Sequence, residues 1–220
     1  MIKAAIFDLD GTLLDRDSSV KSFINRQYER LILDLGHIPK EKYVARFIEL
    51  DKRGYVWKDK VYQQLVEEFE ISEITWEELL QDYIIEFKNH CIAFPNLRQM
   101  LVELKTSNIL LGMITNGYGQ FQMDNIVALG IKEFFDVILV SEWEGIKKPD
   151  PEMFHRAINK LGVSAHECIF IGDHPVNDVA AAQRVGMMGV WKKDFQWKNV
   201  NADYIVDDLV EIPFIIREID

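Results

Sequence analysis

Four short polar segments, far apart in the chain, each lie at the end of an apolar run or at the start of a helical pattern. These segments are Asp8-Leu9-Asp10-Gly11-Thr12, Ile114-Thr115-Asn116-Gly117, Lys148-Pro149-Asp150-Pro151 and Gly172-Asp173-His174-Pro175-Val176-Asn177-Asp178. A parallel sheet brings the carboxyl ends of its strands to one edge, so segments that are distant in sequence can meet in one crevice. The order and placement of the four segments therefore predict a single polar site at the edge of a parallel sheet.

Short apolar runs alternate with helical patterns through most of the chain. The runs that predict buried strands are residues 4–7, 109–114, 137–140, 168–171, 189–191 and 204–206. The patterns that predict helices run from Pro95 to 106 and over 120–129, 151–161 and 176–185, with a closing helix after the last strand. This alternation predicts an α/β fold with a doubly wound, Rossmann-like parallel sheet that has helices on both faces.

Residues 18–88 show helical periodicity and no convincing strand pattern. Thr75 followed by Glu78 is a capping box, which indicates the start of a helix. We therefore expect an all-helical insert at residues 15–90, which interrupts a core formed by residues 1–14 and 91–220. An insert of roughly 75 residues has the size of a small domain.

Composition and charge exclude several classes of function. The formal net charge is -11 at pH 7, so the surface repels nucleic acid and anionic membranes. The N-terminus lacks the pattern of a secretory signal, and no apolar run approaches the length of a membrane span. The two cysteines do not form a disulfide framework, and Cys168 lies in an apolar run that favours burial. We therefore expect a cytoplasmic protein; the sequence gives no signal for its oligomeric state.

Asp8 and Asp10 stand directly after the first predicted strand. A carboxylate can attack phosphorus to form an aspartyl-phosphate, and a second carboxyl group can protonate the leaving oxygen and then deprotonate water. Such an acid needs a raised pKa, and crowding with other carboxylates raises the pKa of a carboxyl group. Gly11 permits a sharp turn and a close approach of the backbone to a ligand. The competing interpretation is a strand end followed by an Asp-Gly turn.

Asp173 and Asp178 follow the predicted strand at residues 168–171. Carboxylates clustered beside Asp8 need a cation, and hard oxygen ligands favour Mg²⁺. For Asp178 the competing interpretation is a helix terminus, because Asp stabilises the first turn of a helix. His174 is not a preferred ligand of a hard cation, so we expect it to have a structural or substrate-side role.

Thr115 and Asn116 end the predicted strand at residues 109–114, where a hydroxyl and backbone N–H groups can bind phosphate oxygens. Asn116 and the glycine after it are also a common turn. Lys148 precedes a proline, which favours an extended chain, and its ammonium could neutralise both a phosphate and a nucleophile. Lys147 is the rival, but only one of two adjacent side chains can face inward on an extended segment.

In order, spacing and strand context, the four segments resemble the four motifs of the haloacid dehalogenase superfamily of phosphohydrolases. The resemblance covers the whole core and implies that Asp8 is the nucleophile and Asp10 the general acid and base. The insert resembles the helical cap of the family, which closes over small substrates. The spacing between Asp173 and Asp178 is similar to that of the nucleotidase-like members.

The same resemblance assigns the remaining site residues. It implies that Thr115 binds phosphate and that Lys148 bridges the phosphate and the nucleophile. It also implies a Mg²⁺ ion held by Asp8, Asp173 and the backbone carbonyl of Asp10. Asp178 would support this metal site.

The acidic residue at position 10 distinguishes branches of the superfamily. The dehalogenases attack carbon and lack an acid at this position, whereas the alkoxide that leaves a phosphate ester needs a proton. We therefore expect a Mg²⁺-dependent phosphatase, a phosphoric monoester hydrolase that acts on a small phosphorylated metabolite. Sugar phosphates, phosphoglycolate-like acids, 5′-nucleotides and other small esters are all open as substrates.

Three other functions compete with the phosphatase. A phosphomutase of the same superfamily would return the phosphoryl group to a bound sugar. A signalling receiver would store the phosphoryl group on Asp8, which the neighbouring Asp10 and the helical insert argue against. A catalytically idle interaction protein is compatible with the fold, but every candidate catalytic residue is present.

Charge is unevenly distributed in the insert, because residues 40–60 are rich in basic side chains and residues 67–86 in acidic ones. Within the basic part, Gly54 breaks the helical pattern between Arg53 and the aromatic residues Tyr55 and Trp57. The functional hypothesis is that Arg53 meets a polar group of the substrate while an aromatic ring covers its planar surface. The structural alternative is a solvated turn whose aromatic rings pack into the insert.

Overall fold

The computed structural model describes residues 1–219, and the chain divides into two compact units. Met1–Asp15 and Ala93–Asp220 form the first, here called the α/β unit. Arg16–Ile92 form the second, here called the helical unit.

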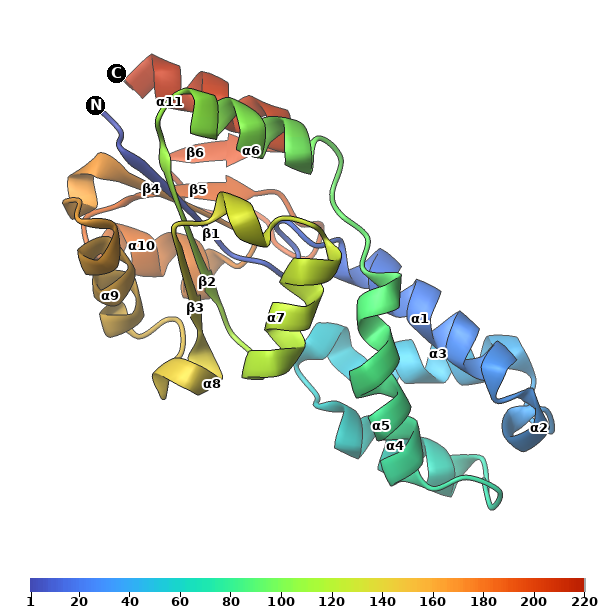
Figure 1. Cartoon of the computed structure of the whole chain (residues 1–220). Helices are drawn as coiled ribbons and strands as arrows, with labels where there is room; N and C mark the ends of the chain where they lie inside the picture. Colours follow the sequence, from blue (N-terminus) through green and yellow to red (C-terminus); the bar gives the residue numbers. More distant parts are fainter. Residues whose placement is uncertain (220) are drawn as a thin grey trace. The chain divides into compact units, whose positions relative to one another are not determined.

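The α/β unit is built on one six-stranded sheet, with the strand order β3-β2-β1-β4-β5-β6 (Figure 1). Its strands are β1 (Ala4–Phe7), β2 (Leu110–Thr115), β3 (Val137–Val140), β4 (Cys168–Gly172), β5 (Met188–Lys192) and β6 (Tyr204–Val206). Every pair of neighbouring strands is parallel, and Ala4 pairs with both Leu110 and Cys168. The prediction of an α/β fold with a doubly wound parallel sheet is confirmed.

Helices cover both faces of this sheet. They are α6 (Leu97–Thr106), α7 (Gly119–Ala128), α8 (Ser141–Glu144), α9 (Pro151–Leu161), α10 (Ala181–Arg184) and α11 (Ile212–Ile219), with short turns η3 (Lys132–Phe134), η4 (Ala165–Glu167), η5 (Pro175–Ala180) and η6 (Leu209–Glu211). The helices α6 and α11 pack together on one face, and α9 and α10 pack together on the other (Figure 1). Buried apolar side chains of β1 and β4, among them Ile6 and Phe170, pack against Phe154 of α9. This core holds the carboxyl ends of the central strands in fixed positions.

Two helix starts differ from the sequence prediction. The placement of Pro95 in the first turn of a helix is wrong, because α6 begins at Leu97. Asn96 before it has a left-handed backbone with a φ of 62°. The segment predicted as one helix at residues 176–185 begins with the π-helical turn η5 and continues as α10. By contrast, α9 ends at a left-handed Gly162 as predicted.

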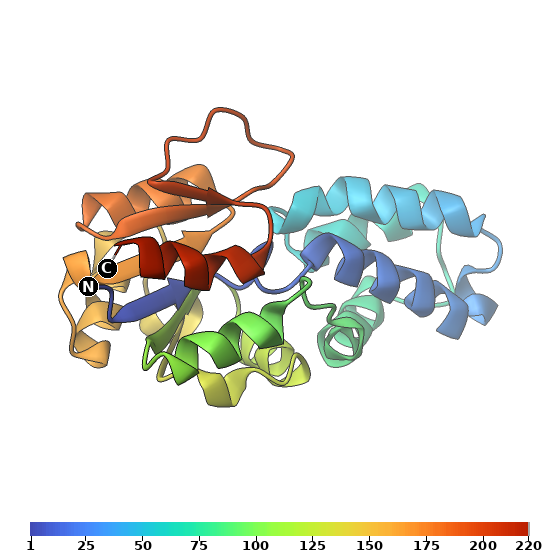
Figure 2. The same cartoon turned by 90° about the horizontal axis from the view of Figure 1, so that it is seen from above.

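The helical unit contains helices and no strand among its residues, as predicted (Figure 2). Its elements are α1 (Arg16–Arg30), α2 (Ile32–Leu35), α3 (Lys40–Asp51), η1 (Lys52–Gly54), α4 (Lys58–Glu68), α5 (Trp76–Glu86) and η2 (Phe87–His90). The predicted capping box of Thr75 and Glu78 starts α5. The buried ring of Phe23 in α1 packs edge to face on Tyr83 in α5, with 5.0 Å between the ring centroids.

Both cysteines are free thiols, and Cys168 is buried in β4 as expected. Within residues 1–219, no helix combines the length and the apolar character that a membrane span needs.

Candidate active site

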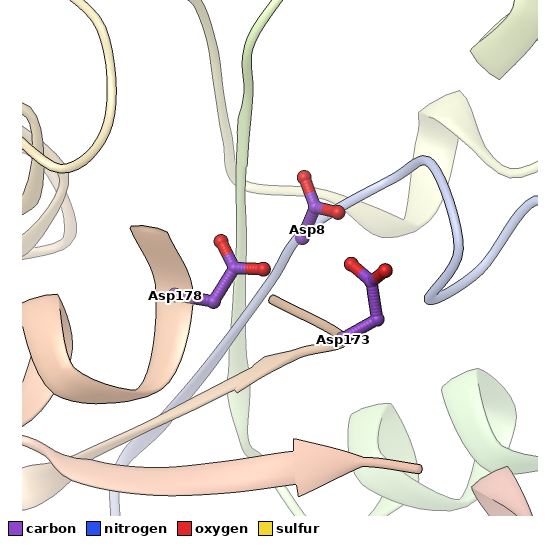
Figure 3. Close-up of side chains that lie close together, drawn as sticks. All are labelled: Asp8, Asp173 and Asp178. Carbon is purple, nitrogen blue, oxygen red and sulfur yellow. The ribbon is translucent and has the colours of Figure 1, made fainter. Parts of the chain in front are cut away.

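Three carboxylates meet at the carboxyl edge of the sheet. Asp8 follows β1, Asp173 follows β4, and Asp178 lies in η5. One carboxylate oxygen from each lies within 4.8 Å of the others, and Figure 3 shows the three groups directed toward a common space. Gly11, with a φ of +84°, makes room for this cluster, because a Cβ there would lie 2.6 Å from Asp173 Oδ2. The structure therefore brings together segments that are up to 170 residues apart in the sequence.

Lys148 is the cation of the cluster. Its ammonium donates to Asp8 Oδ1 at 2.6 Å and to Asp178 Oδ1 at 2.7 Å, and the side chain is buried. Lys147 is exposed. The structure therefore decides which of the two adjacent lysines faces inward, and it is Lys148.

Asn116 fixes the backbone of the lysine. Its Nδ2 donates to the Lys148 carbonyl at 3.0 Å, and its Oδ1 accepts from the Lys148 N–H at 2.9 Å. The side chain of Asn116 is thus engaged with the loop, and any contribution to phosphate binding falls to its backbone N–H. Thr115, the other predicted phosphate ligand, is buried at the end of β2.

The electrostatics of the cluster favour a cation. Burial above all, together with the nearby Asp178 carboxylate, raises the pKa of Asp8 to about 7 against the opposing field of Lys148. Burial and the carboxylates of Asp178 and Asp8 also raise the pKa of Asp173 well above its ordinary value. Burial disfavours the Lys148 ammonium, but Asp178 and Asp8 outweigh this and raise its pKa. Three carboxylates facing one ammonium are an oxygen donor set that fits a hard divalent ion.

Asp10 is linked to Thr115 by Gln122, a residue that the sequence did not single out. The amide nitrogen of Gln122 donates to Asp10 Oδ2 at 2.6 Å and to Thr115 Oγ1 at 2.7 Å. Gln122 is buried in the first turn of α7, the helix that follows the loop after β2. The available signal was its position, because a polar residue in the first turn after a strand-end loop can face back toward that strand end.

The comparison with known proteins agrees with this geometry. A family model of haloacid dehalogenase-like hydrolases matches residues 5–192. The chain belongs to this family. A glyceraldehyde 3-phosphate phosphatase of Pyrococcus abyssi is 29% identical over 198 residues, which cover 88% of this chain and 82% of that protein. A phosphoserine phosphatase of Thermus thermophilus is 29% identical over 220 residues, covering 86% and 88% of the two chains. The crystal structure of a HAD phosphatase from Thermococcus onnurineus has a TM-score of 0.69 and 28% identity, with 98% of each chain covered.

His174 has a structural contact in this haloacid dehalogenase-like hydrolase. Its Nδ1 accepts from the N–H groups of Val176 and Asn177, both at 3.1 Å, so it caps the start of η5. The ring also packs on Trp197, with centroids 5.0 Å apart. The residue that caps this turn is thus His174, whereas Asp178 lies in the first turn, as its competing interpretation expected, without being the cap. Asp178 instead accepts from the His174 N–H at 3.0 Å and from Lys148.

The predicted specificity residues of the helical unit lie around η1. Arg53 has a left-handed backbone and forms an ion pair with Asp17, with its Nη2 at 2.9 Å from Oδ2. Tyr55 is 64% exposed, whereas Trp57 is half-buried and packs edge to face on Tyr83. The structural alternative is therefore wrong for Tyr55, which does not pack into the unit. A substrate role for Arg53, Tyr55 and Trp57 stays a prediction.

Proposed function

We propose that the protein hydrolyses small phosphate monoesters through an aspartyl-phosphate on Asp8, with Mg²⁺ as its cofactor. The protein is a phosphoric monoester hydrolase of the haloacid dehalogenase-like family. The observation that carries the detailed proposal is the position of Asp8, which faces Asp173 and Asp178 and accepts from Lys148 at 2.6 Å. A carboxylate with an ammonium and two further carboxylates beside it, at the carboxyl edge of the sheet, supports the roles of nucleophile, counter-ion and metal ligands.

The residues that would hold the ion are Asp8, Asp173, the backbone carbonyl of Asp10, and Asp178 in support. A bound Mg²⁺ would neutralise charge that develops on the phosphoryl oxygens. Lys148 supplies a second positive charge beside Asp8. The Thr115 hydroxyl and the Asn116 N–H would bind phosphoryl oxygens, which their position at the end of β2 supports.

In the first step, an Asp8 carboxylate oxygen attacks phosphorus, and the bond between phosphorus and the ester oxygen breaks. Asp10 donates its proton to that leaving oxygen, so an alcohol departs. In the second step, Asp10 takes a proton from water as the water oxygen attacks phosphorus. The bond between phosphorus and Asp8 then breaks, which releases inorganic phosphate and restores the enzyme.

The names of the relatives guide the choice of substrate class. Glyceraldehyde 3-phosphate and phosphoserine are both three-carbon phosphate monoesters with polar groups next to the ester. We propose a substrate of this size, and we propose that the helical unit serves as the cap that selects it.

The proposal is tested by phosphate release from a panel of monoesters that includes these two compounds, sugar phosphates and 5′-nucleotides, with and without Mg²⁺. Asp8→Asn is the matched blank, because it removes the nucleophilic charge with little change in volume. We expect Mg²⁺-dependent release by the wild-type protein and none by the variant. Release by Asp8→Asn well above background would contradict the assignment of the nucleophile.

A further inference from the structure

Gln122 connects two groups that the proposed reaction uses. Its side chain is buried, and its amide nitrogen lies 2.6 Å from Asp10 Oδ2 and 2.7 Å from Thr115 Oγ1. We propose that Gln122 is a positioning residue that orients the Asp10 acid and the Thr115 hydroxyl together. This inference rests on the proposed function and extends it to a residue with no reactive chemistry of its own.

The direction of these hydrogen bonds follows from the partners. A carboxyl oxygen that carries no proton can only accept, so the Gln122 nitrogen, and not its oxygen, faces Asp10 Oδ2. Asn125 Nδ2 lies 3.4 Å from Gln122 Oε1, which places a donor beside the oxygen. The Gln122 amide nitrogen makes its two short contacts with Asp10 and Thr115. The Asn116 carbonyl is a third, longer contact at 3.4 Å. One planar amide group therefore sets the orientation of both side chains.

For Asp10, this contact selects the oxygen that carries the transferred proton. Because Oδ2 accepts from Gln122, the proton that passes to the leaving group is held on Oδ1. The bond from the same amide to Thr115 holds Gln122 against the end of β2, and Gln122 in turn holds the Asp10 carboxyl group. An acid that is already held in one orientation loses less conformational entropy on reaching the transition state than an acid that rotates freely.

For Thr115, the same amide determines where the hydroxyl proton points. The oxygen Oγ1 accepts from Gln122, so the Thr115 proton is directed away from that nitrogen. A hydroxyl can rotate and act as donor or acceptor, and a fixed donor nearby removes one of these states. Thr115 is therefore prepared to donate its proton to a phosphoryl oxygen.

The local backbone leaves space for this side chain. Gly117 has a φ of +152°, and a Cβ there would lie 2.9 Å from Gln122 Cγ. The Gln122 N–H donates to the Tyr118 carbonyl at 2.9 Å, which fixes the first turn of α7. Gly117→Ala should therefore displace Gln122 and reproduce part of the effect of replacing it.

The main test compares two substitutions on the same helix. Gln122→Met keeps a similar side-chain length and removes both donors. Gln120→Met makes the same change at an exposed position, where the glutamine bonds to Asp124. The measurements are kcat and KM for an alkyl phosphate and for p-nitrophenyl phosphate with Mg²⁺, the inhibition constant of inorganic phosphate, and the unfolding temperature.

We expect Gln122→Met to lower kcat for the alkyl phosphate by roughly tenfold or more, a part of the ~10²–10⁴-fold contribution of general acid catalysis. The loss should be smaller for p-nitrophenyl phosphate, whose leaving group needs its proton less. Inhibition by inorganic phosphate should weaken, because Thr115 is no longer oriented. Gln120→Met should match the wild-type protein in its kinetics on both substrates, in its phosphate inhibition constant and in its unfolding temperature.

Equal losses on both substrates with an unchanged phosphate inhibition constant would overturn the proposal and leave Gln122 a structural role. In an Asp10→Asn background, Gln122→Met should no longer change the ratio of alkyl to aryl turnover, because coupled residues are not additive. If the wild-type protein released phosphate from no monoester, the proposed function would fail. Calorimetric binding of inorganic phosphate would then decide the inference, which is overturned if Gln122→Met binds as tightly as wild type.

Discussion

The side chain of Asn116 and the backbone of Lys148 are joined by two hydrogen bonds, one in each direction. The lysine is thereby held at its backbone by Asn116 and at its ammonium by Asp8 and Asp178. A long flexible side chain that is fixed at both ends loses most of its rotational freedom before any ligand binds. The positive charge beside Asp8 is therefore preorganised, which is the condition for strong electrostatic stabilisation of a transition state.

Lys148→Met should lower kcat by about 10²-fold or more, the scale of removing one preorganised donor. It should also destabilise the metal-free protein by about 3–5 kcal/mol, because it leaves buried carboxylates without their counter-ion. Lys147→Met is the matched control and should behave as wild type, since Lys147 is exposed. Steady-state kinetics and denaturant unfolding measure the two effects. A greater loss in Lys147→Met would mean that the wrong lysine is assigned.

Asp8→Asn should stabilise the metal-free protein more at pH 8 than at pH 5. The folded-state pKa of Asp8 is raised to about 7, mainly by burial. The carboxyl group of an unfolded chain titrates near ~3.9. Stability from this group is fully present below the unfolded value and is lost as the pH rises through about 7.

Thermal unfolding in a chelator measures this effect as a difference between the variant and wild type. The difference in unfolding temperature should widen from pH 5 to pH 8. Each kcal/mol of stability corresponds to roughly 2–4 °C for a chain of this size. Mg²⁺ should narrow this difference at pH 8 by binding the ionised Asp8 of wild type. Asp207→Asn, at an exposed position, should produce no comparable gap. A constant gap across this pH range would contradict the raised pKa.

Asp10→Asn should reduce turnover of alkyl phosphates more than turnover of p-nitrophenyl phosphate. The aryl leaving group is the weaker base, so it departs more easily without a proton. The ratio of kcat values for the two substrates, compared with the same ratio in wild type, is the relevant measurement. If both fall by the same factor, Asp10 is not the acid.

Activity should require Mg²⁺, and Ca²⁺ should replace it poorly. Mg²⁺ enforces an octahedron of short bonds, whereas Ca²⁺ accepts more ligands at longer distances and could bind both oxygens of Asp8. A nucleophile held by both oxygens cannot align with phosphorus. Titration of the chelated protein with each ion, followed by phosphate release, gives the comparison. Full activity with Ca²⁺ or with chelator alone would exclude this mechanism.

Arg53→Ala should raise KM for the best natural substrate while sparing p-nitrophenyl phosphate, which offers an arginine little to bind. Arg46→Ala is a suitable control, because Arg46 is also an ion-paired arginine of the helical unit and contacts Glu68. Asp17→Asn tests the ion pair itself, since it releases Arg53 without removing it. Equal responses of both substrates, or of Arg46→Ala and Arg53→Ala, would make the η1 segment structural.

The sequence determined the order of the elements and the chemistry at the strand ends. Apolar runs such as residues 4–7 and local stop signals such as Gly162 act over a few residues, so they can be read without the fold. Parallel topology then implied that Asp8 and Asp173 would lie at one edge of the sheet. The structure brings these residues together.

Only the tertiary structure decided how individual side chains pair. It selected Lys148 over Lys147, made His174 and not Asp178 the cap of η5, and joined Gln122 to Asp10 across 112 residues of sequence. The direction of a side chain depends on the backbone of its turn and on neighbours from distant strands. Neither is encoded in local periodicity. For this reason the sequence could predict which residues meet at the edge of the sheet, and only the folded chain showed that Gln122 contacts two of them.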